Sequence, residues 1–313
     1  MLKQLSSREK RVLGIFSFVL PLLIWCAVSY LPFVWHPQML ITEAGDVDYF
    51  QPGMRVGRDV FESEYEAAKS AGKAVPAGVP ANPIYLPAPD QVFTAFYTAF
   101  TMPPEARDAP RLHQSLWHSV QVIFCGFAIS SAIGVPLGIL CGAVARVSRL
   151  SEPFIEFFRY LPAPAFGALA VAILGIYDGP KVAIIVIGTL FQQVLIVANT
   201  TRKLDFALIE AALTLGTRNA KLLSRVVIPG ILPDLYRDQR ILLGWAWTYL
   251  IVAELIGTTS GITWFITQQA RYQHFPNVYA AIFLIGIIGL GTDMVLAALG
   301  RRLFPWDRPT AKG

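Results

Sequence analysis

The chain has 313 residues, of which 54% are hydrophobic and only 15% are charged, and its mean hydropathy is +0.51. Soluble domains carry about 25% charged residues, so this composition predicts a membrane protein. The formal net charge of +5 does not indicate a nucleic-acid-binding protein, because the basic residues stand in short segments beside apolar stretches. The three cysteines lie inside apolar stretches and predict neither a disulfide set nor a metal site.

Six apolar segments are long enough to cross a bilayer, which takes about 20 residues of helix. They predict an all-α, polytopic membrane protein with transmembrane helices at about 12–35, 116–144, 157–176, 182–198, 241–256 and 278–299. The first segment is too long for the apolar region of a signal peptide, and no small-residue cleavage site follows it. We therefore expect it to remain in the membrane as the first span.

The charges of the connecting segments predict the orientation of these spans. Lys and Arg gather in the N-terminal segment, in the connection between the second and third spans, in segment 200–238 and in the C-terminal tail. Segment 36–112 instead has ten acidic and six basic residues. By the positive-inside rule, both termini are cytoplasmic and 36–112 is extracytoplasmic. The predicted organisation is a cytoplasmic N-terminus with the first helix (1–35), an outer loop (36–112), a transmembrane core (113–304) that includes the cytoplasmic loop 200–238, and a cytoplasmic tail (305–313).

The outer loop is long for a connection without structure of its own. Segment 61–71 can form a helix, and the Pro-rich segment 75–83 is expected to be extended and similar to polyproline. A second helix is expected to begin near Pro89, with an apolar stripe of Val92, Phe93, Phe96 and Phe100. The stripe favours a packing helix; a dedicated role in substrate handling is the alternative.

Small and polar residues inside the spans are candidates for function. Gly134, Gly138 and Gly142 recur every fourth residue, which allows close helix packing or a sliding contact. Intramembrane polar groups are costly and so mark functional candidates. Five residues of the fourth and fifth spans are predicted to line a pathway for a small, anionic solute: Gln193, Asn199, Trp245, Tyr249 and Glu254. For each of them, bonding or packing to neighbouring helices is an equal alternative.

Segment 210–229, which reads EAALTLGTRNAKLLSRVVIP, stands between long apolar segments. It resembles the "EAA" loop of bacterial ABC-importer permeases, whose pattern is E-A-A, three residues, G, nine residues, I, one residue and L-P. The matching positions are Glu210, Ala211, Ala212, Gly216, Val226, Ile228 and Pro229. Weaker matches, among them Leu86-Pro87-Ala88-Pro89 and Arg301-Arg302-Leu303-Phe304-Pro305-Trp306, extend the resemblance to the permeases of the nitrate, taurine, alkanesulfonate and bicarbonate group.

This resemblance implies the fold of a type I ABC-importer permease in the cell inner membrane. It also implies the partners: two copies of a cytoplasmic ABC ATPase subunit, a second permease copy and an extracytoplasmic solute-binding protein. The coupling residues that it implies are Glu210, Ala211, Ala212, Gly216 and Pro229. Gly216 is expected to end or bend the docking helix, because glycine relieves backbone strain there. Segment 43–83 departs from the short outer loop usual in the family, which leaves the substrate class and the docking surface undefined.

The chain has no G-x-x-x-x-G-K-[ST] sequence to cradle ATP phosphates, and none of its four histidines forms a His-x-x-x-His pair. We therefore expect no cofactor, no metal and no catalytic residue, with ATP hydrolysis on a separate chain. Two alternatives remain. One is the same architecture importing another solute, such as a nitrogen compound or an aromatic acid. The other is a membrane-embedded enzyme, disfavoured because the spans lack clustered His, Asp or Glu residues.

Overall fold

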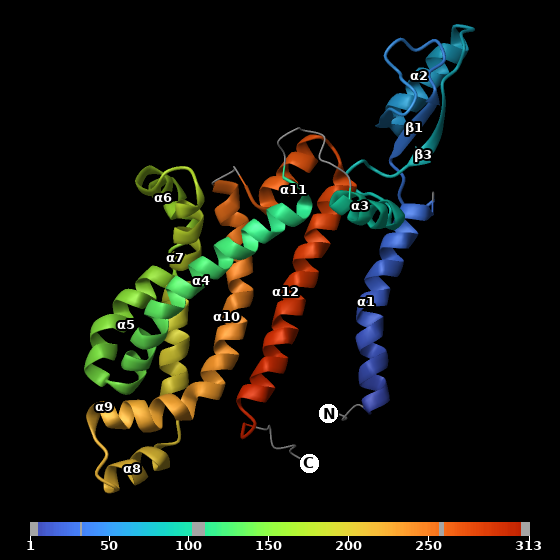
Figure 1. Ribbon diagram of the computed structural model, residues 1–313. Helices are drawn as coiled ribbons and strands as arrows, with labels where there is room; N and C mark the ends of the chain where they lie inside the picture. Colours follow the sequence, from blue (N-terminus) through green and yellow to red (C-terminus); the bar gives the residue numbers. More distant parts are fainter. Residues whose placement is uncertain (1–5, 32, 102–109, 257–259, 308–313) are drawn as a thin grey trace. The chain divides into compact units, whose positions relative to one another are not determined.

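The structure is a computed structural model that describes residues 6–31, 33–101, 110–256 and 260–307 (Figure 1). Most described residues are helical, which confirms the predicted helical class, and a small sheet is added to it. The elements are α1 Ser7–Tyr30, β1 Gln38–Glu43, β2 Arg55–Gly57, α2 Arg58–Ser70, β3 Ala77–Ala81, α3 Pro89–Thr101, α4 Leu112–Ala143, α5 Ala145–Arg159, a 3-10 turn Ala163–Phe166, α6 Gly167–Leu174, α7 Asp178–Arg202, α8 Phe206–Thr214, α9 Asn219–Leu222, a π segment Leu223–Val227, α10 Ile228–Ile256, α11 Ile262–Arg271 and α12 Phe275–Leu303.

The chain divides into two compact units, which we describe separately. The first comprises Met1–Pro103 and Thr267–Ala281, and the second comprises Pro104–Ile266 and Ile282–Gly313. The first unit therefore contains α1, the sheet, α2 and α3. The second contains α4 to α10 and most of α12.

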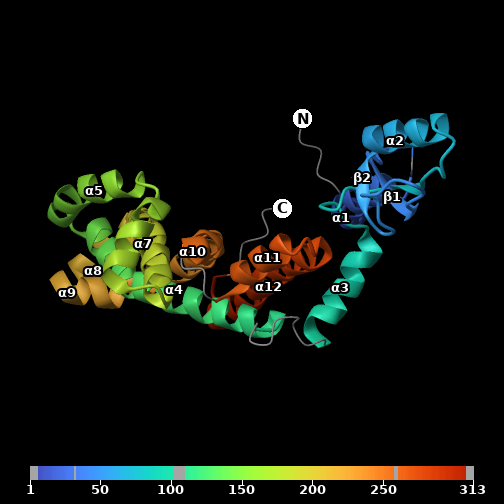
Figure 2. The same cartoon turned by 90° about the horizontal axis from the view of Figure 1, so that it is seen from above.

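The first unit holds a three-stranded antiparallel sheet with the order β2-β1-β3. Its helix α2 lies against the strands (Figure 2). Phe61 of α2 is buried in one cluster with Ile41, Phe50 and Val56. The helix expected at 61–71 is confirmed. Segment 75–83 is extended as expected, but it differs from a free polyproline segment because β3 pairs with β1, placing Pro80 opposite Met39.

Helix α3 packs against α1 in the first unit. The indole N–H of Trp25 donates to the Pro87 carbonyl at 3.1 Å, and the Tyr30 hydroxyl lies 2.5 Å from a carboxylate oxygen of Asp90. Val92 is buried, whereas Phe93 is 72% exposed. The predicted apolar stripe is thus partly buried and partly exposed. The burial of Val92 supports the interpretation of α3 as a packing helix.

The core of the second unit is the contact between α4 and α7, where glycines of α4 meet side chains of α7 without room for a Cβ atom. A Cβ on Gly138 would lie 2.6 Å from Cβ of Val197, and one on Gly142 would lie 2.4 Å from Cβ of Thr201. The Gly134, Gly138 and Gly142 pattern therefore produces close helix packing. Figure 2 shows α5 beside these two helices.

Four described helices are long and apolar enough to cross a membrane: Arg8–Tyr30, Leu112–Ala143, Asp178–Arg202 and Phe275–Leu303. The predicted third span, 157–176, is not one continuous helix. Helix α5 ends at Arg159, and the segment Ala163–Leu174 continues at 86° to it. Pro162 and Pro164 explain the break, because proline removes backbone donors and keeps the preceding residue out of helical geometry. If this bent pair is one span, the described residues contain five candidate membrane spans. The presence of six spans therefore stays a prediction.

Helix α10 begins well before the predicted fifth span and brings charged residues into contact with α12. The guanidinium of Arg240 donates two hydrogen bonds to the carboxylate of Asp293, at 2.9 and 3.1 Å. The Tyr236 hydroxyl donates to the Leu296 carbonyl at 2.8 Å. The structure thus gives Asp293 the role of a structural ion-pair partner.

Candidate functional site

Helix α8 is short, and side chains and backbone groups fix both of its ends. Asp205 is the N-cap, and its carboxylate accepts from the N–H of Ala207 at 3.0 Å. At the other end Gly216 has a φ of +82°, its N–H donates to the Leu213 carbonyl, and the N–H of Thr217 donates to the Ala212 carbonyl, each at 3.0 Å. This pair of bonds is a Schellman motif, which needs a left-handed residue. The sequence expectation that Gly216 ends the helix is confirmed.

Three of the predicted coupling residues lie on α8, Gly216 follows this helix, and Pro229 lies at the start of α10. Glu210 and Ala211 are exposed, whereas Ala212 is 8% exposed. Pro229 is the second residue of α10, directly after the π segment Leu223–Val227. A proline there removes one backbone donor, so the helix ladder is irregular where the loop joins the long helix. Whether these residues act in coupling stays a prediction.

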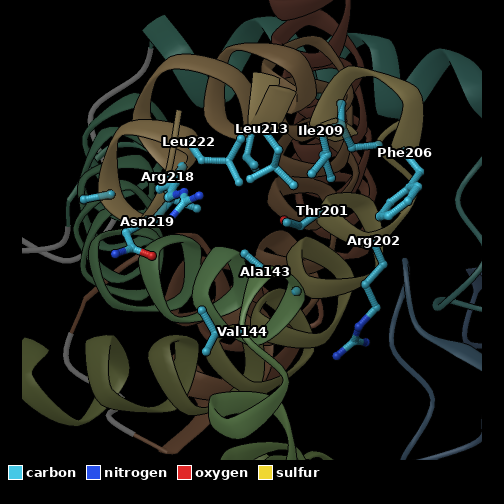
Figure 3. A pocket seen from close by; sticks show the side chains of 15 residues that line it. Ala143, Val144, Thr201, Arg202, Phe206, Ile209, Leu213, Arg218, Asn219 and Leu222 are labelled. Carbon is cyan, nitrogen blue, oxygen red and sulfur yellow. The ribbon is translucent and has the colours of Figure 1, made fainter. Parts of the chain in front are cut away.

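A cavity of about 900 Å³ lies between the α8–α9 loop and the last residues of α4 and α7 (Figure 3). Ala143 and Val144 contribute from the α4 side, and Thr201 and Arg202 from α7. Here the α8–α9 loop means segment 206–227, with both short helices and the π segment. It contributes mostly apolar side chains and two polar ones: Phe206, Ile209, Leu213, Arg218, Asn219, Ala220, Leu222, Leu223 and Val227. Gly142 and Leu204 complete the lining. In Figure 3 Arg218 and Asn219 lie on one side of the cavity, and Arg202 extends away from it.

Gln193 has no exposed surface and joins three helices by hydrogen bonds. Its carbonyl oxygen accepts from the Ser130 hydroxyl at 2.7 Å, and its amide nitrogen donates to Ser131 Oγ at 2.9 Å and to Oε1 of Gln239. In this structure Gln193 is buried and holds α4, α7 and α10 together, which supports the packing alternative.

Glu254 is also fully buried, at the end of α10. Its carboxylate accepts a hydrogen bond from the Ser119 hydroxyl and another from the N–H of Thr263 at 2.8 Å, while the N–H of Ile262 donates to Ser119 Oγ at 2.8 Å. These two N–H groups belong to the first turn of α11, where unpaired donors favour a carboxylate. Glu254 is thus a helix cap in this structure, not a pathway-lining group.

The other three predicted pathway residues lie in different surroundings. Asn199 is exposed, and its carbonyl oxygen accepts from Arg202 at 3.2 Å. Trp245 is 47% exposed, and the ring of Tyr249 packs against Gly188, where a Cβ atom would lie 2.7 Å from it. The structure therefore does not bring the five predicted residues together into one site.

The sequence analysis did not identify a buried polar cluster in the second unit, which is centred on Lys181. Lys181 is fully buried in the first turn of α7. Its ammonium donates to Asp178 at 3.0 Å, to the Ser260 carbonyl at 3.2 Å and to Ser260 Oγ at 2.8 Å. His118 of α4 also contacts Asp178, at 3.0 Å. The sequence signal for this cluster was an Asp three residues before a Lys at the start of a long apolar segment. This spacing allows an ion pair in the first turn of a helix.

Within the described ranges, no group of three His, Cys, Asp or Glu residues is placed to hold a metal ion. The site is thus a capped surface helix beside a cavity, at the ends of two membrane-length helices. Helices of this length and apolarity define an integral membrane protein, and the motif on and after α8 resembles that of ABC-importer permeases.

Residues 134–305 match the family of binding-protein-dependent transport system inner membrane components, and the chain belongs to this family. It is a multi-pass membrane protein and an ABC-importer permease subunit. It is 34% identical over 192 residues to a protein of Brucella abortus (strain 2308) named "Probable ABC transporter permease protein", covering 61% of this chain and 77% of the relative. It is 32% identical over 225 residues to the taurine transport system permease protein of Escherichia coli (strain K12), covering 72% and 81%.

The fold is also that of a solved transporter. A structure of the MetNI methionine ABC transporter in an inward-facing conformation matches with a TM-score of 0.55 and 20% sequence identity, covering 63% of this chain and 96% of that chain. This likeness confirms the predicted fold, that of an ABC-importer permease.

Proposed function

We propose that this chain is the pore-forming subunit of an ATP-driven importer that receives a small, anionic solute from an external binding protein. Two permease copies and two copies of a cytoplasmic ATPase subunit form the transporter. Both chain termini lie in the cytoplasm, as the loop charges predict. The permease itself hydrolyses no ATP.

The observation that carries this proposal is the exposed apolar face of α8. Leu208 is 51% exposed and Leu215, which follows the helix, is 85% exposed. With Ala211 they stand at i, i+3 and i+7, so they lie on one side of the helix. A short helix capped at both ends, with leucines on an exposed face, is suited to insertion into an apolar groove of a partner. Glu210 is also exposed on α8, about 100° around the helix from Ala211, and supplies a charge for orientation.

The connections of α8 explain how motion of the ATPase pair would reach the membrane. Only residues 203–205 separate α8 from the end of α7, and α9 continues through the π segment into α10. A pull on α8 therefore acts on α7 and α10. Gln193 joins these two helices to α4, so they respond together. We propose that this response switches the pathway between inward-facing and outward-facing states.

The proposal of an anionic solute is supported by relatives named for the transport of taurine, aliphatic sulfonates and bicarbonate. Trp245 and Tyr249 remain candidates for the pathway, because neither side chain is bonded into the network of Gln193. Transport of another solute by the same architecture is the alternative. A binding screen on the partner binding protein would identify the solute.

The test is transport by the reconstituted complex of permease and ATPase in vesicles, with the solute-loaded binding protein supplied. Replacing Glu210→Lys should lower solute uptake and ATPase stimulation while the permease remains inserted at normal amount. The matched control is Glu156→Lys on α5, which makes the same charge change at an exposed position outside α8. Equal uptake by both variants would refute the role of α8.

A further inference from the structure

We infer that the cavity beside the α8–α9 loop is a binding site for an acidic glycerophospholipid. The headgroup phosphate is held by Arg218, and an acyl chain lies against Phe206, Ile209 and Leu213. This lipid would connect the loop to the membrane-facing ends of α4 and α7. The inference concerns a ligand of the permease alone and goes beyond the proposed transport function.

The position of the cavity is the first step. Its floor is formed by the last residues of α4 and α7, two helices with the length and apolarity of membrane spans. Helix α7 has 25 residues and is therefore about 38 Å long, slightly more than the roughly 30 Å of hydrocarbon between the two interfaces, so its end lies near the level of the lipid headgroups. The cavity is therefore placed where a phosphate and the upper part of an acyl chain meet.

The chemistry of the walls is the second step. Apolar side chains dominate the lining, which suits hydrocarbon. Two arginines border the cavity, but Arg202 is already bonded to Glu152 and to Ser148 Oγ, the latter at 3.1 Å. No described acidic residue forms an ion pair with Arg218. A basic group beside an apolar pocket on the cytoplasmic side of transmembrane helices is the arrangement that holds acidic lipid headgroups.

The two faces of α8 separate this site from the proposed ATPase surface. Phe206, Ile209 and Leu213 stand at i, i+3 and i+7 and all line the cavity. The face with Leu208 and Leu215 lies elsewhere on the helix, and neither residue lines the cavity. Lipid and ATPase can therefore bind at the same time, and the lipid supports α8 from the side opposite to the partner.

The experiment measures lipid retained by the full-length permease. The protein is reconstituted in bilayers of equal amounts of phosphatidylglycerol and phosphatidylcholine, then extracted in mild detergent, and its bound lipid is identified by native mass spectrometry. We expect selective retention of phosphatidylglycerol. Arg218→Gln should lower that retention about fivefold, the effect of one basic residue near a charged surface. Lys221→Gln, a matched charge removal on α9 outside the cavity lining, should leave it unchanged.

A second variant tests the apolar part of the site. Ala143→Trp fills the cavity from the α4 side and should abolish retention with Arg218 still present. Equal retention of both lipids by the wild-type protein, or equal loss in Arg218→Gln and Lys221→Gln, would overturn the inference. Unchanged lipid retention in Arg218→Gln with weaker ATPase binding would assign the cavity to the partner instead. Failure of transport in the wild-type complex would count against the proposed function only, because the lipid measurement needs no ATPase.

Discussion

A Cβ atom on Gly261 would lie 2.0 Å from Oε1 of Glu254, the buried carboxylate that caps α11. Gly261 also has a φ of +105°, a region that side chains disfavour. Gly261, directly before α11, therefore leaves room for the cap.

Gly261→Ala should lower the thermal stability of the protein, because the new methyl group displaces Glu254 and adds backbone strain of about 1–3 kcal/mol. The measurement is heat-induced loss of the monodisperse peak in detergent. Gly289→Ala in α12 is the control, since nothing lies within 4 Å of its added Cβ atom. The role assigned to Gly261 is wrong if both variants melt alike.

Gly216 is predicted to act through its backbone conformation. Nothing lies within 4 Å of a Cβ built on it, so the cost of substitution comes from its φ of +82°. Gly216→Val should disrupt the cap of α8 and reduce stimulation of the ATPase. Gly216→Asn should keep most of the stimulation, because asparagine tolerates the left-handed region. Assays of the reconstituted complex distinguish them, and an equal loss in both variants would point to side-chain size instead.

The Lys181 cluster predicts unequal effects for its two charges. The side chain of Lys181 has no exposed surface, whereas that of Asp178 is 48% exposed. Asp178→Ala leaves a buried ammonium with only Ser260 to accept its hydrogen bonds, which is costly. Lys181→Met leaves a carboxylate that water can still solvate. Asp178→Ala should therefore reduce the melting temperature more than Lys181→Met does, and the reverse order would contradict this account of the cluster.

Gln193→Leu should destabilise the protein, because it removes the hydrogen bonds that join α4, α7 and α10. Interhelical hydrogen bonds in membranes contribute about 0.6–2 kcal/mol each. Asn199→Leu, on the same helix but exposed, should have little effect on stability. Thermal unfolding and solute uptake are measured for both. A stable Gln193→Leu protein that has lost uptake would restore the pathway role for this residue.

The predicted topology is tested by cysteine labelling. In a variant without Cys26, Cys125 and Cys141, a cysteine at Ser63 in α2 should react with an impermeant reagent added to intact cells. One at Thr214 in α8 should react only after the membrane is opened. Both positions are exposed, so accessibility within the chain does not limit the reaction. Labelling of both from outside would rule out the proposed orientation.

The features predicted from the sequence are those that depend on local pattern. The apolar lengths indicated the long helices, and Gly216 in its motif indicated the end of α8. The break between α5 and α6 was missed because apolar composition is the same in a straight and a bent segment. The sheet was missed because pairing of β1 with β3 depends on contacts distant in sequence.

For the site residues too, the sequence indicated features of local pattern but not contacts between residues distant in sequence. The ion pair of Arg240 with Asp293 was not predicted, because Arg240 lies before the predicted fifth span, 241–256, and the start of α10 at Ile228 could not be read from hydropathy. Gln193 and Glu254 were recognised as rare polar groups. Their hydrogen bonds with Ser130 and Ser119 depend on how α4 packs against α7 and α10. The residue type alone does not specify that packing.

The close packing of α4 on α7 has a mechanical consequence. A larger side chain of α7 packs against each glycine of α4. Val197 packs against Gly138, and Thr201 packs against Gly142. A shift of α7 along its axis by one residue, about 1.5 Å, would move these side chains off the glycines and into the flanking residues of α4. The pair therefore resists sliding and travels as one rigid rod. A pull on α8 would therefore reach α7 through residues 203–205 and tilt α4 with it, so that the two helices act as a single lever.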